Sequence, residues 1–394
     1  MDKLKVGVFT DSYKPYTSGV VRSIDTFTTE LEAMGHQIFI FAPNYPNCDK
    51  RETGVFRFPS IPAPTHPNYS LALPFSFRMR NIAEKLNLDI IHVHSPFLLG
   101  RVGARYAKRM QIPLVFTFHT LYEEYVHYIP FAHGITKDLT QRLSSDFCNQ
   151  CDLVVTPTRI VSDYIKSLGV KTGVVNVPTG IQVQDYGSGD KEWLQKYYSI
   201  PGHEKVLLCV GRLGREKNLQ WLLESIALVG KQYTHFRLVL VGEGPEENNL
   251  KDKTVELGIE NKVTFTGVLP KEKVIHCYNS SDIFVFASVT ETQGLVIGEA
   301  KAAGLPVVAV DANGVSEMVE HEKDGFLTEL NQEEFAGRVL TMLKDEGIRK
   351  QMAEQAVINV DQISSKNCAL KLLRCYIDLI EKHNKLRHNI FNIN

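Results

Sequence analysis

Short, continuous apolar runs alternate with helical stretches along most of this 394-residue chain. The runs are rich in β-branched residues and do not alternate with polar ones, which is typical of strands buried on both faces of a parallel sheet. In the N-terminal half they occupy residues 6–10, 38–41, 90–93, 114–118 and 153–155. Because parallel strands need crossover connections, this pattern predicts a doubly wound α/β fold.

The same pattern starts again in the C-terminal half, so the chain is expected to form two domains. Its apolar runs there are residues 206–210, 238–241, 263–265, 283–286 and 307–310. A polar, glycine-rich stretch at 185–190 is suited to a linker. We therefore predict Rossmann-like domains at 1–185 and 195–365, with a last helix at about 366–386 that packs back on the first domain. Their facing strand ends should form a cleft for ligands.

Composition limits the class of protein but not its partner. No apolar run approaches the ~20 residues that span a membrane, and residues 1–5 lead directly into a strand, unlike a signal peptide. We expect a cytoplasmic protein. The formal net charge is −1, with a mildly basic N-terminal half. Cys148 and Cys151 form a C-x-x-C without a second pair, so we expect ordinary reduced thiols.

The segment 291–299 carries the strongest chemical signal. A loop containing Glu291 follows a predicted strand, a helix begins near Gly294, and Glu299 falls in its second turn. The backbone N–H groups of Gln293, Gly294 and Leu295 would be free to bind an anion. One ligand could therefore bind Glu291 through the hydroxyls of one sugar, the helix start through phosphate, and Glu299 through the hydroxyls of a second sugar. A nucleotide sugar has this layout.

A second signal follows the first strand of the C-terminal domain. Arg212 and Lys217 flank a turn there and are able to converge on a diphosphate, where two fixed cations stabilise charge on a departing phosphate. No D-x-D motif occurs in the sequence. We therefore expect no metal ion and no other cofactor. The segment 241–245 supplies another tight turn after a strand.

Two residues of the N-terminal domain lie at predicted strand or helix ends. Gly19 is placed at the start of a helix, where the lack of a side chain lets a phosphate approach. His119 follows the strand at 114–118 and should face the same cleft. One glycine is too few for a dinucleotide-binding fingerprint.

Together, the Gly19 loop, His119, Arg212 with Lys217, and the Glu291 motif resemble glycosyltransferase family 4 of the GT-B fold. The resemblance covers almost the whole chain. It implies that Gly19 lies against the donor diphosphate, that His119 contacts the transferred sugar near its 6-hydroxyl, and that Arg212 and Lys217 hold the phosphates. It further implies a retaining hexosyltransferase in which the leaving phosphate takes the acceptor's proton on the same face of the sugar.

The resemblance also assigns the remaining donor contacts. Glu291 would bind the 3- and 4-hydroxyls of the sugar, Glu299 the ribose, and the backbone near Val268 and Leu269 the base. The family often has Phe at the position of Gln293, a departure that affects local packing rather than the backbone amides.

A narrower resemblance is carried by segments 92–97, 119–128 and 291–295, which are similar to bacterial 1,2-diacylglycerol 3-glucosyltransferases. It implies transfer of glucose from UDP-glucose to a lipid at the inner face of the cell membrane. The stretch 75–82 is basic and partly apolar, which suits an anionic membrane surface. The candidate acceptor or membrane residues are Phe77, Arg78, Arg80 and Tyr122, with Phe75 and Met79 as further apolar contacts.

Three alternatives remain at this stage. In the first, the protein is a glycosyltransferase whose acceptor is a small soluble molecule such as malate or an inositol phosphate. In the second, it is a nucleotide-sugar epimerase. In the third, it binds nucleotide sugars without catalysis. Nothing in the sequence points to a nucleic-acid partner.

Overall fold

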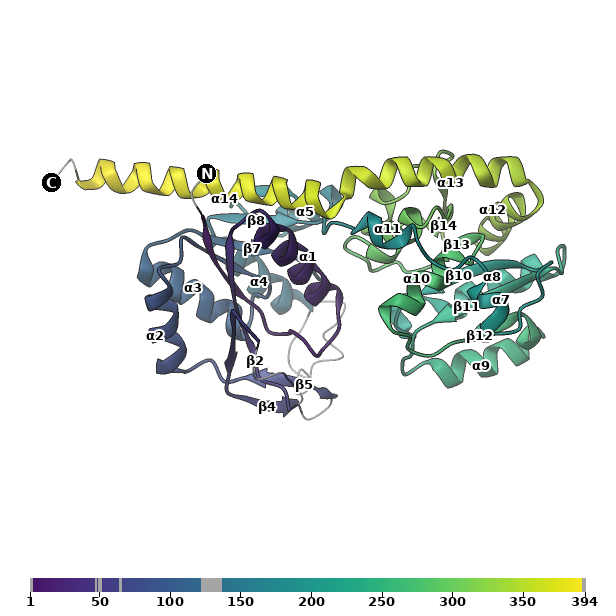
Figure 1. Ribbon diagram of the computed structural model, residues 1–394, viewed down its shortest axis with the longest axis horizontal. Coiled ribbons are helices and arrows are strands. Elements are labelled where there is room, and N and C mark those ends of the chain that lie inside the picture. Colours follow the sequence, from purple (N-terminus) through teal and green to yellow (C-terminus); the bar gives the residue numbers. More distant parts are fainter. Residues whose placement is uncertain (1–2, 47, 49–51, 64–65, 122–136, 392–394) are drawn as a thin grey trace. The chain divides into compact units, whose positions relative to one another are not determined.

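A computed structural model describes residues 3–46, 48, 52–63, 66–121 and 137–391 of the chain. The chain divides into two compact units (Figure 1). The first comprises Met1–Gly180 together with Ser365–Asn394, and the second comprises Ile181–Ser364.

The first unit is built on a sheet in the order β3-β2-β1-β6-β7-β8-β9, in which every described strand pair is parallel. Chain order reverses between the neighbours β1 and β6, so the loops that follow these two strands lie at the switch point of the sheet. The strands are β1 (Lys5–Phe9), β2 (Gln37–Pro43), β3 (Val55–Phe58), β6 (Ile90–Val93), β7 (Leu114–Thr117), β8 (Leu153–Thr156) and β9 (Val174–Asn176). A separate antiparallel hairpin joins β4 (Ser60–Ala63) and β5 (His66–Ala72).

Helices cover this sheet, and the first of them begins where the sequence predicts. The Ser18 hydroxyl accepts a hydrogen bond from the Val21 amide at 3.3 Å, and Gly35 has the positive φ of 92° that suits a residue just after a helix. The helix α14 packs on α1, as Figure 1 shows. The helices are α1 (Gly19–Ala33), α2 (Phe77–Leu86), α3 (Leu98–Met110), α4 (Lys137–Cys148), α5 (Arg159–Ser167) and α14 (Ser365–Phe391).

The second unit has a parallel sheet in the order β12-β11-β10-β13-β14-β15, with its switch point between β10 and β13. Its strands are β10 (Lys205–Val210), β11 (Phe236–Val241), β12 (Val263–Phe265), β13 (Ile283–Phe286), β14 (Val307–Val310) and β15 (Gly325–Thr328). Its α-helices are α6 (Val183–Tyr186), α7 (Trp193–Tyr197), α8 (Leu219–Gly230), α9 (Glu247–Glu256), α10 (Lys271–Asn279), α11 (Leu295–Ala302), α12 (Gln332–Lys344) and α13 (Glu346–Val360). Short 3₁₀ turns are η4 (Arg215–Lys217), η5 (Glu260–Lys262), η6 (Asn313–Glu317) and η7 (Asp361–Ile363). The doubly wound α/β prediction is confirmed.

The stretch 185–190 is not a free linker, contrary to the sequence-based expectation. It lies inside the second unit, where Tyr186 is buried and its ring packs edge-on against Tyr278 at 5.7 Å. The carbonyl of Tyr186 accepts a hydrogen bond from Asn279 at 2.7 Å. The division between the units falls instead at Gly180 and Ile181.

The C-x-x-C cysteines are ordinary thiols, as expected. Cys148 and Cys151 are free and buried at the end of α4. Burial raises the pKa of Cys148 to about 12 and raises the pKa of Cys151 further, so neither thiol ionises readily near neutral pH.

Two loops of the second unit approach each other through their backbones. The Leu213 amide donates to Glu243 O at 2.9 Å, and the Glu246 amide donates to Leu213 O at 3.0 Å. Between them, a Cβ at Gly244 would lie 2.7 Å from the Leu213 nitrogen and closer still to its carbonyl. The glycine in segment 241–245 therefore holds the loop after β10 in place by allowing this contact.

We expect Gly244→Ala to destabilise the second unit by about 1–3 kcal/mol, because the added methyl group overlaps rigid backbone atoms. Gly337→Ala is the matched control, since a Cβ at this position in α12 would meet nothing within 4 Å. The control should gain up to about 1 kcal/mol from helix propensity. Thermal unfolding of both variants measures the difference, and equal midpoints would contradict the close-approach role of Gly244.

Candidate functional site

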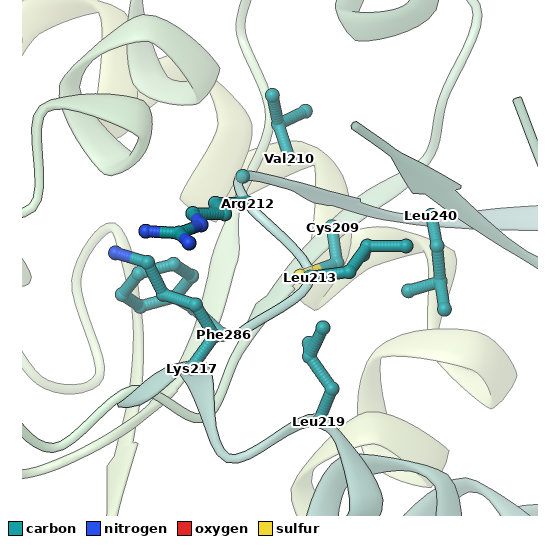
Figure 2. A pocket seen from close by; sticks show the side chains of 9 residues that line it. Cys209, Val210, Arg212, Leu213, Lys217, Leu219, Leu240 and Phe286 are labelled. Atoms are coloured by element: carbon teal, nitrogen blue, oxygen red, sulfur yellow. The ribbon is translucent and has the colours of Figure 1, made fainter. Parts of the chain in front are cut away.

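Arg212 and Lys217 lie at the switch point of the second sheet, in the loop between β10 and α8. Lys217 ends the turn η4, and Asn218 follows in the left-handed conformation with φ 55°. Figure 2 shows the nitrogen ends of Arg212 and Lys217 close together beside the ring of Phe286, in a pocket that Cys209 and Leu240 also line. The predicted pair of convergent cations is therefore present in this loop.

The neighbouring Arg215 takes no part in this convergence. Its side chain is 81% exposed and pairs with Glu246 at 3.0 Å. Arg212, although exposed, and Lys217 thus both line the pocket, whereas Arg215 does not.

Glu291 lies beside these cations, at the carboxyl end of β13. Its carboxylate forms an ion pair with the Lys217 ammonium, and both side chains are largely shielded from water. The Ser288 hydroxyl donates to Glu216 O at 3.1 Å, which ties the loop after β13 to the turn η4. The structure thus brings together two segments that the sequence separates by more than seventy residues.

The backbone after Glu291 leads into α11 as the sequence predicts. Gly294 precedes the first helical residue, Leu295, in a left-handed conformation with φ 84°. The Gly314 amide donates to Glu291 O at 2.9 Å, and a Cβ at Gly314 would lie 2.6 Å from the Gln293 nitrogen. The turn η6 therefore packs backbone against backbone on this loop and holds its amides in place.

Four predicted donor residues occupy different environments from that of Glu291. Gln293 is buried, so its side chain packs inward where the family often has Phe. Glu299 is also buried, and its carboxylate accepts a hydrogen bond from the Tyr278 hydroxyl at 2.8 Å. In the loop after β12, Val268 is exposed whereas Leu269 packs against the core. The ribose and base contacts of these residues stay predictions.

In the first unit, His119 lies just beyond β7 and is paired with a histidine that follows β6. The distance between His94 Nδ1 and His119 Nε2 is 2.8 Å, and the two rings are stacked with centroids 5.0 Å apart. Burial lowers the pKa of His119 to about 3 and the pKa of His94 well below its ordinary value. Both imidazoles are therefore neutral at pH 7, able to donate and accept hydrogen bonds to a sugar hydroxyl but not to carry charge.

Gly19 is exposed at the start of α1, and a Cβ there would meet nothing within 4 Å. Protein packing therefore does not require a glycine here, which leaves room for a ligand. The preceding loop holds a feature that the sequence motifs do not reveal: the carboxylate of half-buried Asp11 accepts hydrogen bonds from the Ser95 hydroxyl at 2.5 Å and the Leu99 amide at 2.7 Å. This contact could have been predicted from the polar residues at the ends of the adjacent strands β1 and β6.

Most of the candidate membrane residues lie on α2, and one apolar expectation is wrong. Phe77 is 85% exposed and Arg78 is also exposed, whereas Met79 is buried in the first unit's core. Arg80 pairs with Glu84 at 3.1 Å. Met79 faces inward because a helix turns by about 100° per residue, so consecutive residues cannot share one face. Tyr122 lies outside the described residues.

No group of three or more His, Cys, Asp or Glu side chains suited to a metal ion occurs in the part of the chain that the structure describes.

Two family models match the chain, one to each half. Residues 17–185 match "Glycosyltransferase Family 4", and residues 190–357 match "Glycosyl transferases group 1". The chain is 33% identical over 389 residues to the alpha-monoglucosyldiacylglycerol synthase of Streptococcus pneumoniae, covering 97% of this chain and 87% of that protein. It is 30% identical over 397 residues to the enzyme of the same name from Acholeplasma laidlawii, covering 97% and 99% of the two chains.

The fold is also found among solved structures. Anabaena HepE in complex with UDP superposes with a TM-score of 0.79 at 20% identity, over 95% of this chain and 100% of that one. Taken with the family matches, this confirms the two Rossmann-like domains of the GT-B fold. The chain therefore belongs to the family 4 and group 1 glycosyltransferases and is a GT-B enzyme that transfers a glycosyl group.

Proposed function

We propose that this enzyme transfers glucose from UDP-glucose to 1,2-diacylglycerol in a membrane, with retention of the anomeric configuration. The observation that carries the proposal is the near full-length similarity to two proteins named as alpha-monoglucosyldiacylglycerol synthases. The donor-side residues and the surface of the first unit support it.

On the donor side, the charges suit a diphosphate leaving group. Arg212 and Lys217 would hold the phosphates, with the amides of Gln293, Gly294 and Leu295 directed at the sugar beside them. As the bond to the sugar breaks, negative charge grows on the departing UDP, and fixed cations already in place stabilise it without reorganisation. In this proposal no metal ion is required.

Reaction on one face of the sugar would account for retention. The acceptor hydroxyl approaches from the side on which UDP leaves, and the departing phosphate oxygen takes its proton. Glu291 binds the sugar hydroxyls, while neutral His119 hydrogen-bonds near the 6-hydroxyl. Neither residue is asked to become a covalent nucleophile.

An exposed apolar surface supports a lipid acceptor. Ile61, Leu73, Phe75 and Phe77, here called the apolar patch, lie in the β4–β5 hairpin, just after it and at the start of α2, and all are exposed. Phe75 and Phe77 are 81% and 85% exposed, values that a soluble acceptor does not explain. Such side chains insert readily at the boundary between headgroups and acyl chains.

Basic residues accompany the apolar patch. The Arg105 guanidinium of α3 lies over the Phe75 ring at 5.6 Å, and Arg78 is exposed beside Phe77. Arg80 contributes less than expected, because Glu84 accepts hydrogen bonds from both Arg80 at 3.1 Å and Arg109 at 2.8 Å. No helix among the described residues has the length and apolar character needed to cross a bilayer.

A turnover screen tests the proposed reaction. UDP- and GDP-sugars are offered with diacylglycerol vesicles, with malate or inositol phosphate, and without acceptor. We expect the highest kcat/KM for UDP-glucose with diacylglycerol, and an α-linked product. Faster transfer to a soluble acceptor would reject the lipid acceptor, and conversion of the donor sugar without acceptor would indicate an epimerase.

Lys217→Ala should lower kcat by about 10²-fold or more, by analogy with the loss of one preorganised donor at a developing charge. Binding of the ground state should weaken much less, because the charge on the phosphate grows as the bond breaks. Steady-state kinetics with UDP-glucose measures the change. Arg215→Ala is the matched control, since this neighbouring cation points to Glu246, and its kcat should stay within about threefold of wild type.

Steady-state kinetics in the presence of EDTA tests whether Arg212 and Lys217 take the place of a metal ion. Activity should survive chelation, because Arg212 and Lys217 supply the positive charge. A reaction abolished by EDTA and restored only by Mg²⁺ or Mn²⁺ would contradict the proposal, as would a loss of less than threefold in Lys217→Ala.

Phe77→Ser combined with Arg78→Glu should weaken binding to anionic vesicles at least tenfold. Each basic residue near a charged leaflet contributes about 1 kcal/mol, and an exposed Phe adds its own burial. Co-sedimentation at low and high salt measures the binding, while a UDP titration should show unchanged affinity. Turnover on vesicles should fall more than turnover on a short-chain, water-soluble acceptor.

Val255→Ser in α9 is the control for removing an exposed apolar side chain, because Val255 is 65% exposed in the second unit. It should leave vesicle binding intact. Wild-type protein without salt-sensitive vesicle binding would refute the membrane-docking role of the apolar patch.

A further inference from the structure

A buried polar network connects the C-terminal helix α14 to the histidines of the first unit. Tyr376 of α14 places its hydroxyl 2.5 Å from His92 Nδ1, and His92 Nε2 lies 2.6 Å from the Thr117 hydroxyl. These groups are almost fully buried in the core between the sheet and the helix. The role proposed above for His119 uses neither Tyr376 nor His92.

Ring stacking extends this network to His119. The His92 ring lies against His94 with centroids 4.2 Å apart, and the His94 ring stacks on His119 at 5.0 Å with an interplanar angle of 18°. The hydrogen bond between His94 and His119 closes the series at 2.8 Å. Three imidazoles thus form a continuous row whose inner end is held by Tyr376.

The hydrogen bonds of the network are coupled to one another because its imidazoles are neutral. Burial lowers the pKa of His92 and of His119 to about 3, and the pKa of His94 well below its ordinary value. A neutral imidazole donates at one nitrogen and accepts at the other. If Tyr376 donates to His92 Nδ1, then His92 Nε2–H donates to Thr117; the reverse assignment runs the other way. In both assignments, the direction of the Tyr376 hydrogen bond and the tautomer of His92 are coupled.

Apolar packing alone does not hold the His92 ring. A small cavity lies against His92, His94 and Tyr376, bounded on its other sides by side chains that include Ile24 and Phe27. Packing against the ring is therefore incomplete on the side of this cavity. The two hydrogen bonds, to Tyr376 and Thr117, add directional contacts that orient the ring.

We propose that Tyr376 is a positioning residue for His119, acting through the orientation of His92 and the row of contacting imidazoles. This inference rests on the proposed function, in which His119 contacts the transferred sugar. Tyr376 itself touches no substrate in this account. Its hydroxyl holds the ring of His119 at the angle at which the sugar's hydroxyl is bound.

The test uses Tyr376→Phe in the full-length protein, which keeps the aromatic ring and removes only the hydroxyl. We expect kcat to fall about tenfold with UDP affinity unchanged, since the cations that bind UDP lie in the other unit. Imidazole ¹⁵N–¹H NMR spectra supply a readout independent of turnover. The signals of His92 and His119 should both shift in the variant, although only His92 loses a hydrogen bond.

Leu372→Ala is the matched control. Leu372 is a buried apolar residue one turn before Tyr376 in the same helix, so its truncation weakens the packing of α14 while the hydrogen-bonding groups of the network remain in place. It should lower Tm at least as much as Tyr376→Phe does, yet leave kcat and the imidazole signals near wild type. That separation distinguishes positioning from general stability.

Two outcomes overturn the proposal. One is a Tyr376→Phe enzyme with normal kcat and an unmoved His119 signal. The other is a parallel loss of kcat and Tm in Tyr376→Phe and Leu372→Ala, which would show a purely structural role. If His119→Ala leaves turnover intact, the sugar-binding role of His119 fails instead, and the NMR spectra show separately whether Tyr376 controls the imidazole row.

Discussion

Parallel pairing of the described strands in both main sheets is the constraint from which the rest of the structure follows. Parallel strands are buried on both faces, so their interiors are apolar and their polar residues must lie at or beyond the strand ends. All carboxyl ends of one sheet meet at the same edge. Arg212 and Lys217 after β10 and Glu291 after β13 gather there, as do Asp11, His94 and His119 in the first unit. The candidate site residues within each unit are thus brought to one sheet edge by topology rather than by proximity in sequence.

Within the second unit, the ion pair between Lys217 and Glu291 links the two roles proposed for these residues. The Glu291 carboxylate balances the charge of the Lys217 ammonium while no nucleotide sugar is bound. In the proposed function, the diphosphate of the nucleotide sugar is a second anion beside Lys217, and the sugar hydroxyls donate hydrogen bonds to Glu291. Binding a nucleotide sugar therefore exchanges one set of charge-assisted contacts for another, which reduces the cost of desolvating either side chain alone.

The sequence predicted what periodicity and strand ends can reveal. The central strands, the start of α1 and the cations Arg212 and Lys217 were placed correctly, because each depends on local pattern. The edge strands β3, β9 and β15 were missed, since they are three or four residues long and only partly apolar. Such short runs carry too little signal to separate from loops.

Contacts between distant segments cannot be predicted from local sequence patterns. The inward orientation of Met79 depends on which face of α2 meets the core, and the burial of Tyr186 depends on Tyr278. The bond between His92 and Tyr376 joins residues 284 positions apart. Because no local pattern in a single sequence relates residues so far apart, only the folded structure identifies these contacts.

The placement of α14 in the first unit also has a consequence for the order of folding during synthesis. Residues 1–180 leave the ribosome first, yet the hydroxyl that satisfies His92 arrives only with residue 376, after the whole second unit. Until then, the face of α1 that α14 covers stays open to water. The first half of the polypeptide is therefore made early but completed last, and a nascent chain stalled within the second unit would expose this unfinished face to chaperones and proteases.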